Sequence, residues 1–205
     1  PDDGVTVVLS GDVPLTQADT LQALMDATQG ERLALLTLEM DDPTGYGRIV
    51  RQADGSVQAI VEHRDASDEQ RRIREIYSGI MAVPTRLLLP WLKRLRNDNA
   101  QQEYYLTDVV KLAVADGQSV VAQVLTDPVQ VAGVNTPVQL AELERSYQQR
   151  RAHALMLQGV RLRDPARFDV RGELTCERDV EIDVNCLFQG HVHLGEGVRI
   201  GAHCV

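Results

Sequence analysis

The fold is decided by residues 5–15, which read VTVVLSGDVPL. The β-branched run Val5 to Val8 predicts a buried strand, because such side chains suit a pleated surface that is covered on both faces. Gly11 lets the backbone bend or approach a ligand closely, and Asp12 then stands at the carboxyl end of the strand, where open α/β sheets bind their ligands. A carboxylate at that place can hold a magnesium ion that in turn holds phosphate, or it can hydrogen-bond its own turn. These residues alone favour the turn.

The bulk properties are those of a soluble globular protein of 205 residues, 43% hydrophobic and 25% charged. A net charge of -9 argues against a nucleic-acid-binding surface. Because the sequence has no apolar run that could span a bilayer and no signal peptide, we expect a cytoplasmic protein that binds no membrane. The chain begins with Pro1, enters a core strand almost at once and ends inside a repeat, so we expect an internal fragment of a longer protein.

Alternating strands and helices up to about residue 137 predict an α/β domain with a mixed sheet. Besides residues 5–8, the expected strands are 32–40, 48–50, 56–62, 76–83, 119–125 and 129–131. The expected helices are 16–30 with Thr16 as N-cap, 65–74, one from Pro84, and 107–115. A long amphipathic helix from Pro137 to about Gln158 is interpreted as a connector between two bodies.

An internal repeat of six residues fills the last segment. Its apolar positions are Val170, Cys176, Ile182, Phe188, Leu194 and Ile200, each followed four residues later by Leu174, Val180, Cys186, Val192, Val198 and Cys204. A period of six predicts a triangular β-helix with these side chains pointing inward. Two turns of such a solenoid cannot bury their own core, so we expect the repeat to continue beyond Val205.

The three cysteines, Cys176, Cys186 and Cys204, fall within this repeat. An odd number without CxxC spacing argues against a disulfide framework and a zinc site, and predicts reduced, buried thiols. His191, His193 and His203 fall at outward positions of the hexads, which predicts surface residues rather than metal ligands.

Five motifs in order resemble one bacterial family. They are SGDVPL at 10–15, DPTGYGRI at 42–49, IVEH at 60–63, EYYLTD at 103–108 and GVN at 133–135. Together they closely resemble the bifunctional N-acetylglucosamine-1-phosphate uridylyltransferase and glucosamine-1-phosphate N-acetyltransferase family. The resemblance covers essentially the whole chain, and it is the order and spacing of the motifs that make it specific.

The resemblance implies a fold and its division. It implies a mixed-sheet, Rossmann-like nucleotidyltransferase domain, a long connector helix and the start of a left-handed parallel β-helix. The implied boundaries are 1–137 for the carboxy-terminal part of the uridylyltransferase domain, 138–158 for the linker helix and 159–205 for the first coils of the acetyltransferase domain. The hexapeptide domain implies a homotrimer.

The resemblance also implies residue roles. Asp12 and Asn135 would be the two protein ligands of Mg²⁺, leaving room for waters and phosphate oxygens on an octahedral cation. Gly47 would bring its backbone against the sugar nucleotide, and Glu62 would accept hydrogen bonds from the N-acetylglucosamine hydroxyls. Ser10 and Gly11 would line the nucleotide side of the same crevice. Without the family, each of these residues would be interpreted as an ordinary turn, loop or strand end.

The implied activity has two steps. Glucosamine 1-phosphate is acetylated from acetyl-CoA, and UMP then passes from UTP to N-acetylglucosamine 1-phosphate, giving UDP-N-acetylglucosamine and pyrophosphate and feeding peptidoglycan and lipopolysaccharide synthesis. Uridylyl transfer needs little acid–base chemistry, since positioning and charge neutralisation carry it. The family's glycine-rich triphosphate loop and its acetyltransferase histidine have no counterpart in these residues, so we expect no catalytic residue here and no activity of the chain alone.

One position departs from the family. Tyr77-Ser78-Gly79 stands where many members have Asn-Thr-Gly or Asn-Ser-Gly, and the sugar-binding role of that asparagine is not transferred to Tyr77. Two alternatives stay open: another sugar-nucleotide pyrophosphorylase with a hexapeptide tail, such as a glucose-1-phosphate enzyme, and a non-catalytic trimerisation or binding module. The residues immediately before Pro1 would separate the module from the enzyme.

Overall fold

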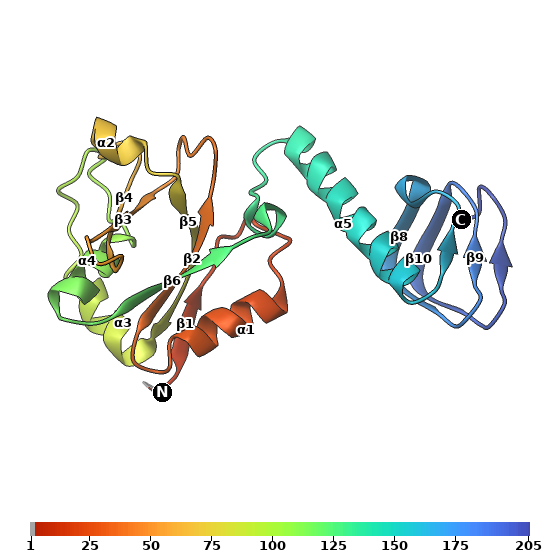
Figure 1. The fold of residues 1–205 in the computed structure, drawn as a ribbon, viewed down its shortest axis with the longest axis horizontal. Helices are drawn as coiled ribbons and strands as arrows, with labels where there is room; N and C mark the ends of the chain where they lie inside the picture. The colour runs from red at the N-terminus through yellow and green to blue at the C-terminus, as the bar shows by residue number, and fades with distance from the viewer. Residues whose placement is uncertain (1–2) are drawn as a thin grey trace. The chain divides into compact units, whose positions relative to one another are not determined.

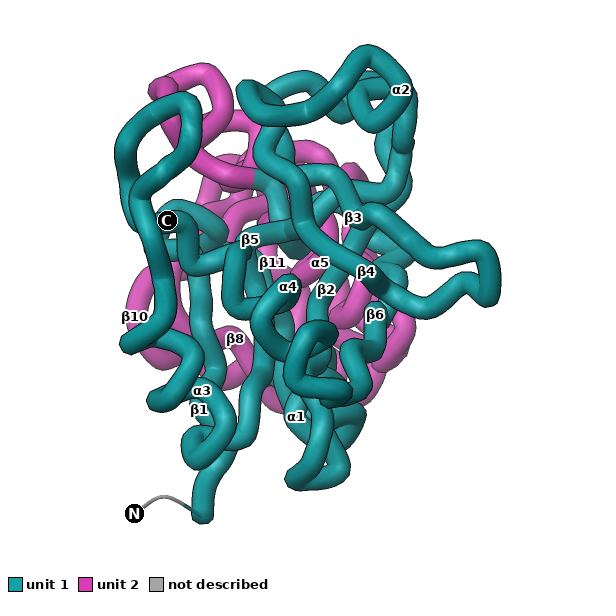
Figure 2. The backbone as a smooth tube through the Cα atoms, turned by 90° about the vertical axis from the view of Figure 1, so that its left-hand side faces the viewer, with its two compact units in different colours: residues 1–132 teal, residues 133–205 magenta. Residues whose placement is uncertain are grey.

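The computed structural model describes residues 3–205 and divides the chain into two compact units, residues 1–132 and 133–205 (Figure 2). Each unit has its own hydrophobic core. The boundaries implied by the family, at 137/138 and 158/159, stay a prediction. No helix among residues 3–205 is long and apolar enough to cross a membrane.

The first unit is built on a six-stranded mixed sheet (Figure 1). Its strands are β1 (Val5–Val8), β2 (Leu33–Glu39), β3 (Arg48–Arg51), β4 (Val57–Val61), β5 (Glu75–Pro84) and β6 (Val120–Leu125). The order is β4-β3-β5-β2-β6, and β1 pairs with β5 outside this path. Only β2 and β6 run parallel, while all the other pairs are antiparallel. The predicted mixed α/β architecture is therefore confirmed.

Helices cover this sheet on both faces. Its helices are α1 (Ala18–Ala27), α2 (Asp68–Arg71), α3 (Thr85–Leu92) and α4 (Asp108–Ala115). Strand β2 is buried along nearly its whole length: Leu33 and Leu35 pack with Trp91 of α3 and Val109 of α4, while the alternate residues pack with Leu24 of α1. A strand covered on both faces reads as a continuous apolar run, which is why LALLTL was recognisable in the sequence.

Two local predictions in this unit are wrong because of contacts distant in sequence. Thr16 does not cap α1: Gln17 holds the N-cap position without a side-chain bond, and the Thr16 hydroxyl donates to the Gln130 carbonyl at 2.8 Å. Residues 129–131 form no strand but part of a 3₁₀ turn, Pro128–Val131. Pro128 at the first position and the Asp127 side chain accepting from the Val129 N–H start this turn.

Two further expectations need adjusting. The helix expected over 65–74 is confined to α2, where Ser67 and Gln70 form a capping box. Strand β1 is half-buried along its length rather than buried, because it pairs with β5 alone. The turn at Asp54-Gly55 between β3 and β4 forms as expected.

The second unit combines one long helix with two small parallel sheets. Helix α5 (Pro137–Leu157) begins with a capping box of Thr136 and Gln139. The sheets are β8 (Phe168–Cys176) with β10 (Cys186–Leu194), and β7 (Arg161–Leu162), β9 (Glu181–Ile182) and β11 (Arg199–Ile200) in the order β11-β9-β7. A 3₁₀ turn, Pro165–Arg167, precedes β8.

The six-residue repeat corresponds to one core. Every predicted inward residue of the repeat packs into it except Cys204, which is exposed. The three cysteines are free, but only Cys186 is buried as predicted, since Cys176 is half-buried. Burial raises the pKa of the Cys176 thiol. His191, His193 and His203 are exposed, as expected.

Polar side chains of α5 complete the hydrogen bonds along one edge of β8. The Gln148 amide donates to the Val170 carbonyl at 3.0 Å and accepts from the Val170 N–H at 2.8 Å. Arg151 donates to the Gly172 carbonyl at 2.6 Å. Just before β8, Arg145 donates to the carbonyl of Ala166 in the 3₁₀ turn at 3.1 Å. Helix α5 thus supplies partners that a neighbouring strand would otherwise supply.

We expect Gln148→Leu to lower the free energy of unfolding of the second unit by about 2–4 kcal/mol. Gln148 and Val170 are each 1% exposed, so leucine would leave a buried N–H and a buried carbonyl without partners, each costing about 1–3 kcal/mol. Gln149→Leu, at the exposed neighbouring position, is the matched control and should change stability by less than about 0.5 kcal/mol. Thermal unfolding followed by circular dichroism measures both; equal midpoints for the two variants would contradict the role of Gln148.

Candidate functional site

Two of the predicted site residues of the first unit, Ser10 and Gly47, contact one stretch of β5, Tyr77 to Gly79. From one side, the Ser10 hydroxyl donates to the Gly79 carbonyl at 3.5 Å. From another, the Tyr77 N–H donates to the Gly47 carbonyl at 2.9 Å. A Cβ built on Gly79 would lie 2.3 Å from the Ser10 oxygen, and Gly79 has a φ of +89°, so glycine is required at this contact. The stretch that departs from the family pattern therefore touches both Ser10 and Gly47.

Gly47 and Glu62 face each other across β3 and β4. Gly47 is buried, and a Cβ at this position would lie 2.8 Å from Ile60 Cγ2 and 3.6 Å from Glu62 Oε2. Real Cβ atoms do not approach that closely, so any side chain at position 47 would displace Ile60. The packing of Ile60 therefore already requires glycine at position 47, beside the Glu62 carboxylate, and the approach of Gly47 to a sugar nucleotide stays a prediction.

The Glu62 carboxylate is held by a residue to which the sequence assigned no role. The Thr107 hydroxyl, 8% exposed, donates to Glu62 Oε1 at 2.8 Å. Thr107 belongs to the EYYLTD motif, and membership of that motif was the only signal available in the sequence. With one oxygen engaged by Thr107, Glu62 keeps Oε2 for a ligand hydroxyl.

Tyr77 lies close enough to Glu62 for their ionisation to interact. Burial raises the pKa of the Tyr77 hydroxyl well above its usual value, and the negative charge of Glu62 adds to the rise. Tyr77 therefore stays protonated and neutral, able to donate and to accept a hydrogen bond.

A cavity of about 220 Å³ opens beside Glu62 and Thr107. Its charged lining consists of the carboxylates of Glu62, Asp65, Asp98 and Asp108 and the amine of Lys111. Lys111 is paired with Asp108 at 2.9 Å, so carboxylates dominate the lining. Such a lining suits a neutral group rich in hydroxyls, such as a sugar, better than a phosphate.

Asp12 and Gly11 lie exposed in the loop that follows β1. Among the residues that the structure describes, the Asp12 carboxylate has no hydrogen-bond or ion-pair partner. No atom lies within 4 Å of a Cβ built on Gly11, so packing within the chain does not require glycine there. An unpaired carboxylate oxygen fits a hard cation such as Mg²⁺.

Asn135 belongs to the second unit, where it precedes α5. It is exposed, and its backbone N–H donates to Gln139 Oε1 at 2.8 Å, which leaves its side-chain amide oxygen available. A carboxylate and an amide oxygen form a suitable ligand set for Mg²⁺. The pairing of Asn135 with Asp12 stays a prediction, because the two residues belong to different units. No group of three or more metal-ligating side chains occurs among residues 3–205.

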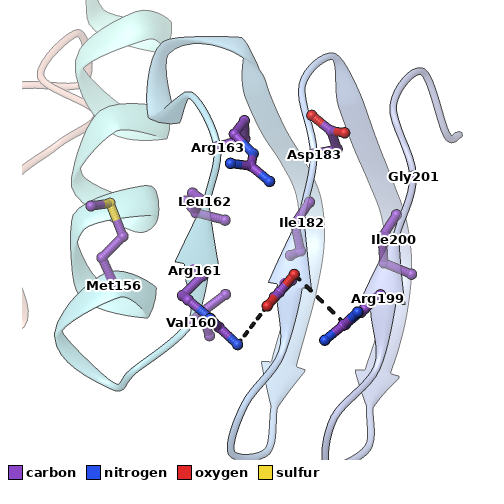
Figure 3. Close-up of a pocket in the computed structure, with 11 residues that line it drawn as sticks. Met156, Val160, Arg161, Leu162, Arg163, Ile182, Asp183, Arg199, Ile200 and Gly201 are labelled. Carbon is purple, nitrogen blue, oxygen red and sulfur yellow. Dashed lines mark ion pairs between the residues drawn. The ribbon is translucent and has the colours of Figure 1, made fainter.

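A cavity of about 810 Å³ lies in the second unit and is lined by none of the predicted site residues (Figure 3). A row of ion pairs crosses it, with Glu181 between Arg161 at 2.5 Å and Arg199 at 3.7 Å. These arginines are largely exposed, and such pairs contribute little to stability.

Comparison with known proteins gives consistent names. The chain is 73% identical over 195 residues to a protein of Polaromonas naphthalenivorans named "Bifunctional protein GlmU", an alignment covering 94% of this chain and 41% of that protein. Proteins of the same name from Paracidovorax citrulli and Methylibium petroleiphilum are 66% and 61% identical, over 98% and 100% of this chain and 44% and 45% of theirs. The chain thus spans less than half the length of these relatives. No family model matches.

Among solved structures, the chain is similar to a putative glucose-1-phosphate thymidylyltransferase from Bacillus anthracis in complex with a sucrose. The TM-score is 0.49 with 19% sequence identity, over 69% of this chain and 53% of the other.

Proposed function

Because nearly the whole chain aligns with part of the GlmU family, as its motifs predicted, we propose that it carries the sugar- and metal-facing part of a uridylyltransferase site and the start of an acetyltransferase domain. The observation that carries this proposal is the 73% identity over 94% of the chain. In the full protein, glucosamine 1-phosphate is acetylated from acetyl-CoA, and UMP is then transferred from UTP to N-acetylglucosamine 1-phosphate with release of pyrophosphate. The product feeds peptidoglycan and lipopolysaccharide synthesis in the cytoplasm.

On the sugar side, each residue has a physical task. Gly47 brings its backbone against the sugar nucleotide, and its carbonyl accepts a hydrogen bond from the Tyr77 N–H. Glu62, oriented by Thr107, accepts hydrogen bonds from sugar hydroxyls. Fixing the sugar in this way positions the 1-phosphate for attack, and positioning is the main contribution that a protein makes to phosphoryl transfer.

On the nucleotide side, Ser10 and Gly11 line the crevice, and Asp12 and Asn135 supply the protein oxygens for Mg²⁺. Mg²⁺ held by these two residues would supply positive charge that neutralises the phosphate oxygens. Asp12 needs no proton transfer for this task, since its carboxylate acts as a ligand.

For the second unit we propose the first coils of a left-handed parallel β-helix that assembles as a homotrimer. Register supports the helix: Phe168 pairs with Cys186 and Glu181 with Arg199, in both cases eighteen residues apart, which is three hexads. The third parallel pair departs from this offset, since Arg161 pairs with Glu181, twenty residues on. Parallel stacking at a repeating offset, with apolar residues of every hexad turned into one core, is the arrangement expected of a solenoid.

The test is a substrate panel on the full-length protein that contains this chain. We expect UDP-N-acetylglucosamine from UTP and N-acetylglucosamine 1-phosphate, no comparable product from glucose 1-phosphate, and acetyl transfer from acetyl-CoA to glucosamine 1-phosphate. The isolated 205 residues should form no product. Turnover of glucose 1-phosphate alone would show that the protein is another sugar-nucleotide pyrophosphorylase. No turnover of any nucleotide and sugar phosphate would favour the non-catalytic trimerisation or binding module.

A further inference from the structure

Arg48 is the largest fully buried side chain of the described chain, and it has no carboxylate ion pair there. It is 1% exposed, and burial lowers the pKa of its guanidinium. Its Nε is buried without a hydrogen-bond partner. Burying a cation in this way costs free energy, so packing alone gives no reason to have arginine at this position.

The contacts of the guanidinium indicate what it does. Arg48 Nη1 donates to the Tyr46 carbonyl, the residue before Gly47. Arg48 Nη2 lies 3.3 Å from Nδ1 of His63, the residue after Glu62. One planar group therefore joins the two segments that carry Gly47 and Glu62, while its partners are the neighbours of these two residues.

Two charged groups near Arg48 bond the two segments that it joins: Asp42 bonds the loop before Gly47, and Arg71 bonds His63. Asp42, at the start of the loop that ends at Gly47, accepts from the Thr44 N–H at 3.1 Å. Hydrogen bonds from the Thr44 side chain and N–H lower the pKa of Asp42, and the charge of Arg48 adds to the effect. Arg71 approaches from α2 and donates to the His63 carbonyl at 3.4 Å.

We propose that Arg48 is a positioning residue that sets the spacing between Gly47 and Glu62 by clamping Tyr46 to His63, and thereby sets the affinity for the sugar phosphate. This inference rests on the proposed function for its ligand. A planar guanidinium bonds both partners at once in a fixed geometry, which a lysine cannot do.

The experiment uses Arg48→Met and Arg48→Lys in the full-length protein. For Arg48→Met we expect the KM for N-acetylglucosamine 1-phosphate to rise roughly 10-fold, with kcat and the KM for UTP changed less than about 3-fold. The reason is that a variable spacing between Gly47 and Glu62 weakens binding of the sugar before it affects the nucleotide. Arg48→Lys should recover part of the loss. The melting temperature of Arg48→Met should stay within a few degrees of that of the wild type, since an apolar side chain replaces an incompletely bonded buried cation.

Arg51→Met is the matched control. Arg51 lies on the same strand but pairs with Glu75 at 2.7 Å, away from the Tyr46–His63 clamp. It should lower the melting temperature without changing the sugar KM. An unchanged sugar KM in Arg48→Met, with the wild type active, would overturn the clamp alone, whereas an inactive wild type would overturn the proposed function.

A second measurement does not depend on catalysis. In the 205-residue chain, the Tyr46 N–H donates to the Pro43 carbonyl at 3.2 Å and should be protected from hydrogen exchange. Arg48→Met should accelerate exchange at Tyr46 at least about 5-fold relative to Arg51→Met. Equal exchange in the two variants would contradict a clamp on this loop.

Discussion

Replacing Asp12 with alanine in the full-length protein should lower uridylyl transfer at least about 100-fold and leave acetyl transfer unchanged. Metal coordination supplies several kcal/mol to the stabilisation of phosphate charge, and Asp12 is the one carboxylate that the sequence assigns to this task. In the structure its side chain is exposed and unpaired among the described residues, so its removal should leave the melting temperature unchanged.

Separate assays of the two activities, at rising Mg²⁺ concentration, measure this effect. Asp19→Ala is the control, because Asp19 is likewise exposed and lies in the first turn of α1. Binding of Mn²⁺ in place of Mg²⁺, followed by calorimetry, gives a readout that does not depend on turnover. Retention of uridylyl transfer in Asp12→Ala would remove Asp12 from the metal site.

Replacing Gly172 with alanine should lower the free energy of unfolding of the second unit by at least about 4 kcal/mol, the largest stability effect expected in this chain. Gly172 pairs with Gly190 in the β8–β10 register. A Cβ on Gly172 would lie 2.2 Å from the Gly190 carbonyl oxygen, and the φ of +131° is itself unfavourable for alanine. Backbone cannot rotate away as a side chain does, so the strands would have to separate.

Two other glycines of the same unit separate the steric clash from the unfavourable backbone conformation. Gly190→Ala introduces a residue with a φ of +77° but meets no atom within 4 Å, so it should cost only about 1 kcal/mol. Gly201→Ala meets neither problem and should be neutral. Calorimetry measures the loss, while fluorescence of Trp91, the single tryptophan, reports the first unit and should not change. A cost in Gly172→Ala no larger than in Gly190→Ala would contradict the steric argument.

Much of the fold could be predicted because its signals are local in sequence. The hexad repeat names its core residues by spacing alone, and only Cys204 fell outside that core. Strand β2 and the turn at Asp54-Gly55 also follow from short runs of residues. Thr16 and residues 129–131 failed for one reason: the Thr16 hydroxyl bonds the carbonyl of Gln130, more than a hundred residues away, and no local rule includes that contact.

In the candidate site, too, local motifs could be recognised in the sequence, whereas partners distant in sequence could not. Gly47 and Glu62 could be named from motifs, and the structure brings them together. Their supporting residues could not be named, since the Thr107 hydroxyl reaches Glu62 across forty-five positions and Arg48 reaches His63 across fifteen. Such partners are set by packing of the whole unit rather than by any spacing in the sequence.

The hydrogen bonds between Gln148 and Val170 also make the two edges of the β8–β10 sheet unequal. An uncovered strand edge offers unpaired N–H and carbonyl groups to any other strand, including one from another molecule. At β8 those groups at Val170 are already bonded to a helix, while β10 lies at the other edge of the same sheet. Further strands, from this chain or from another molecule, can therefore pair with β10, whereas pairing with the Val170 backbone is blocked by α5.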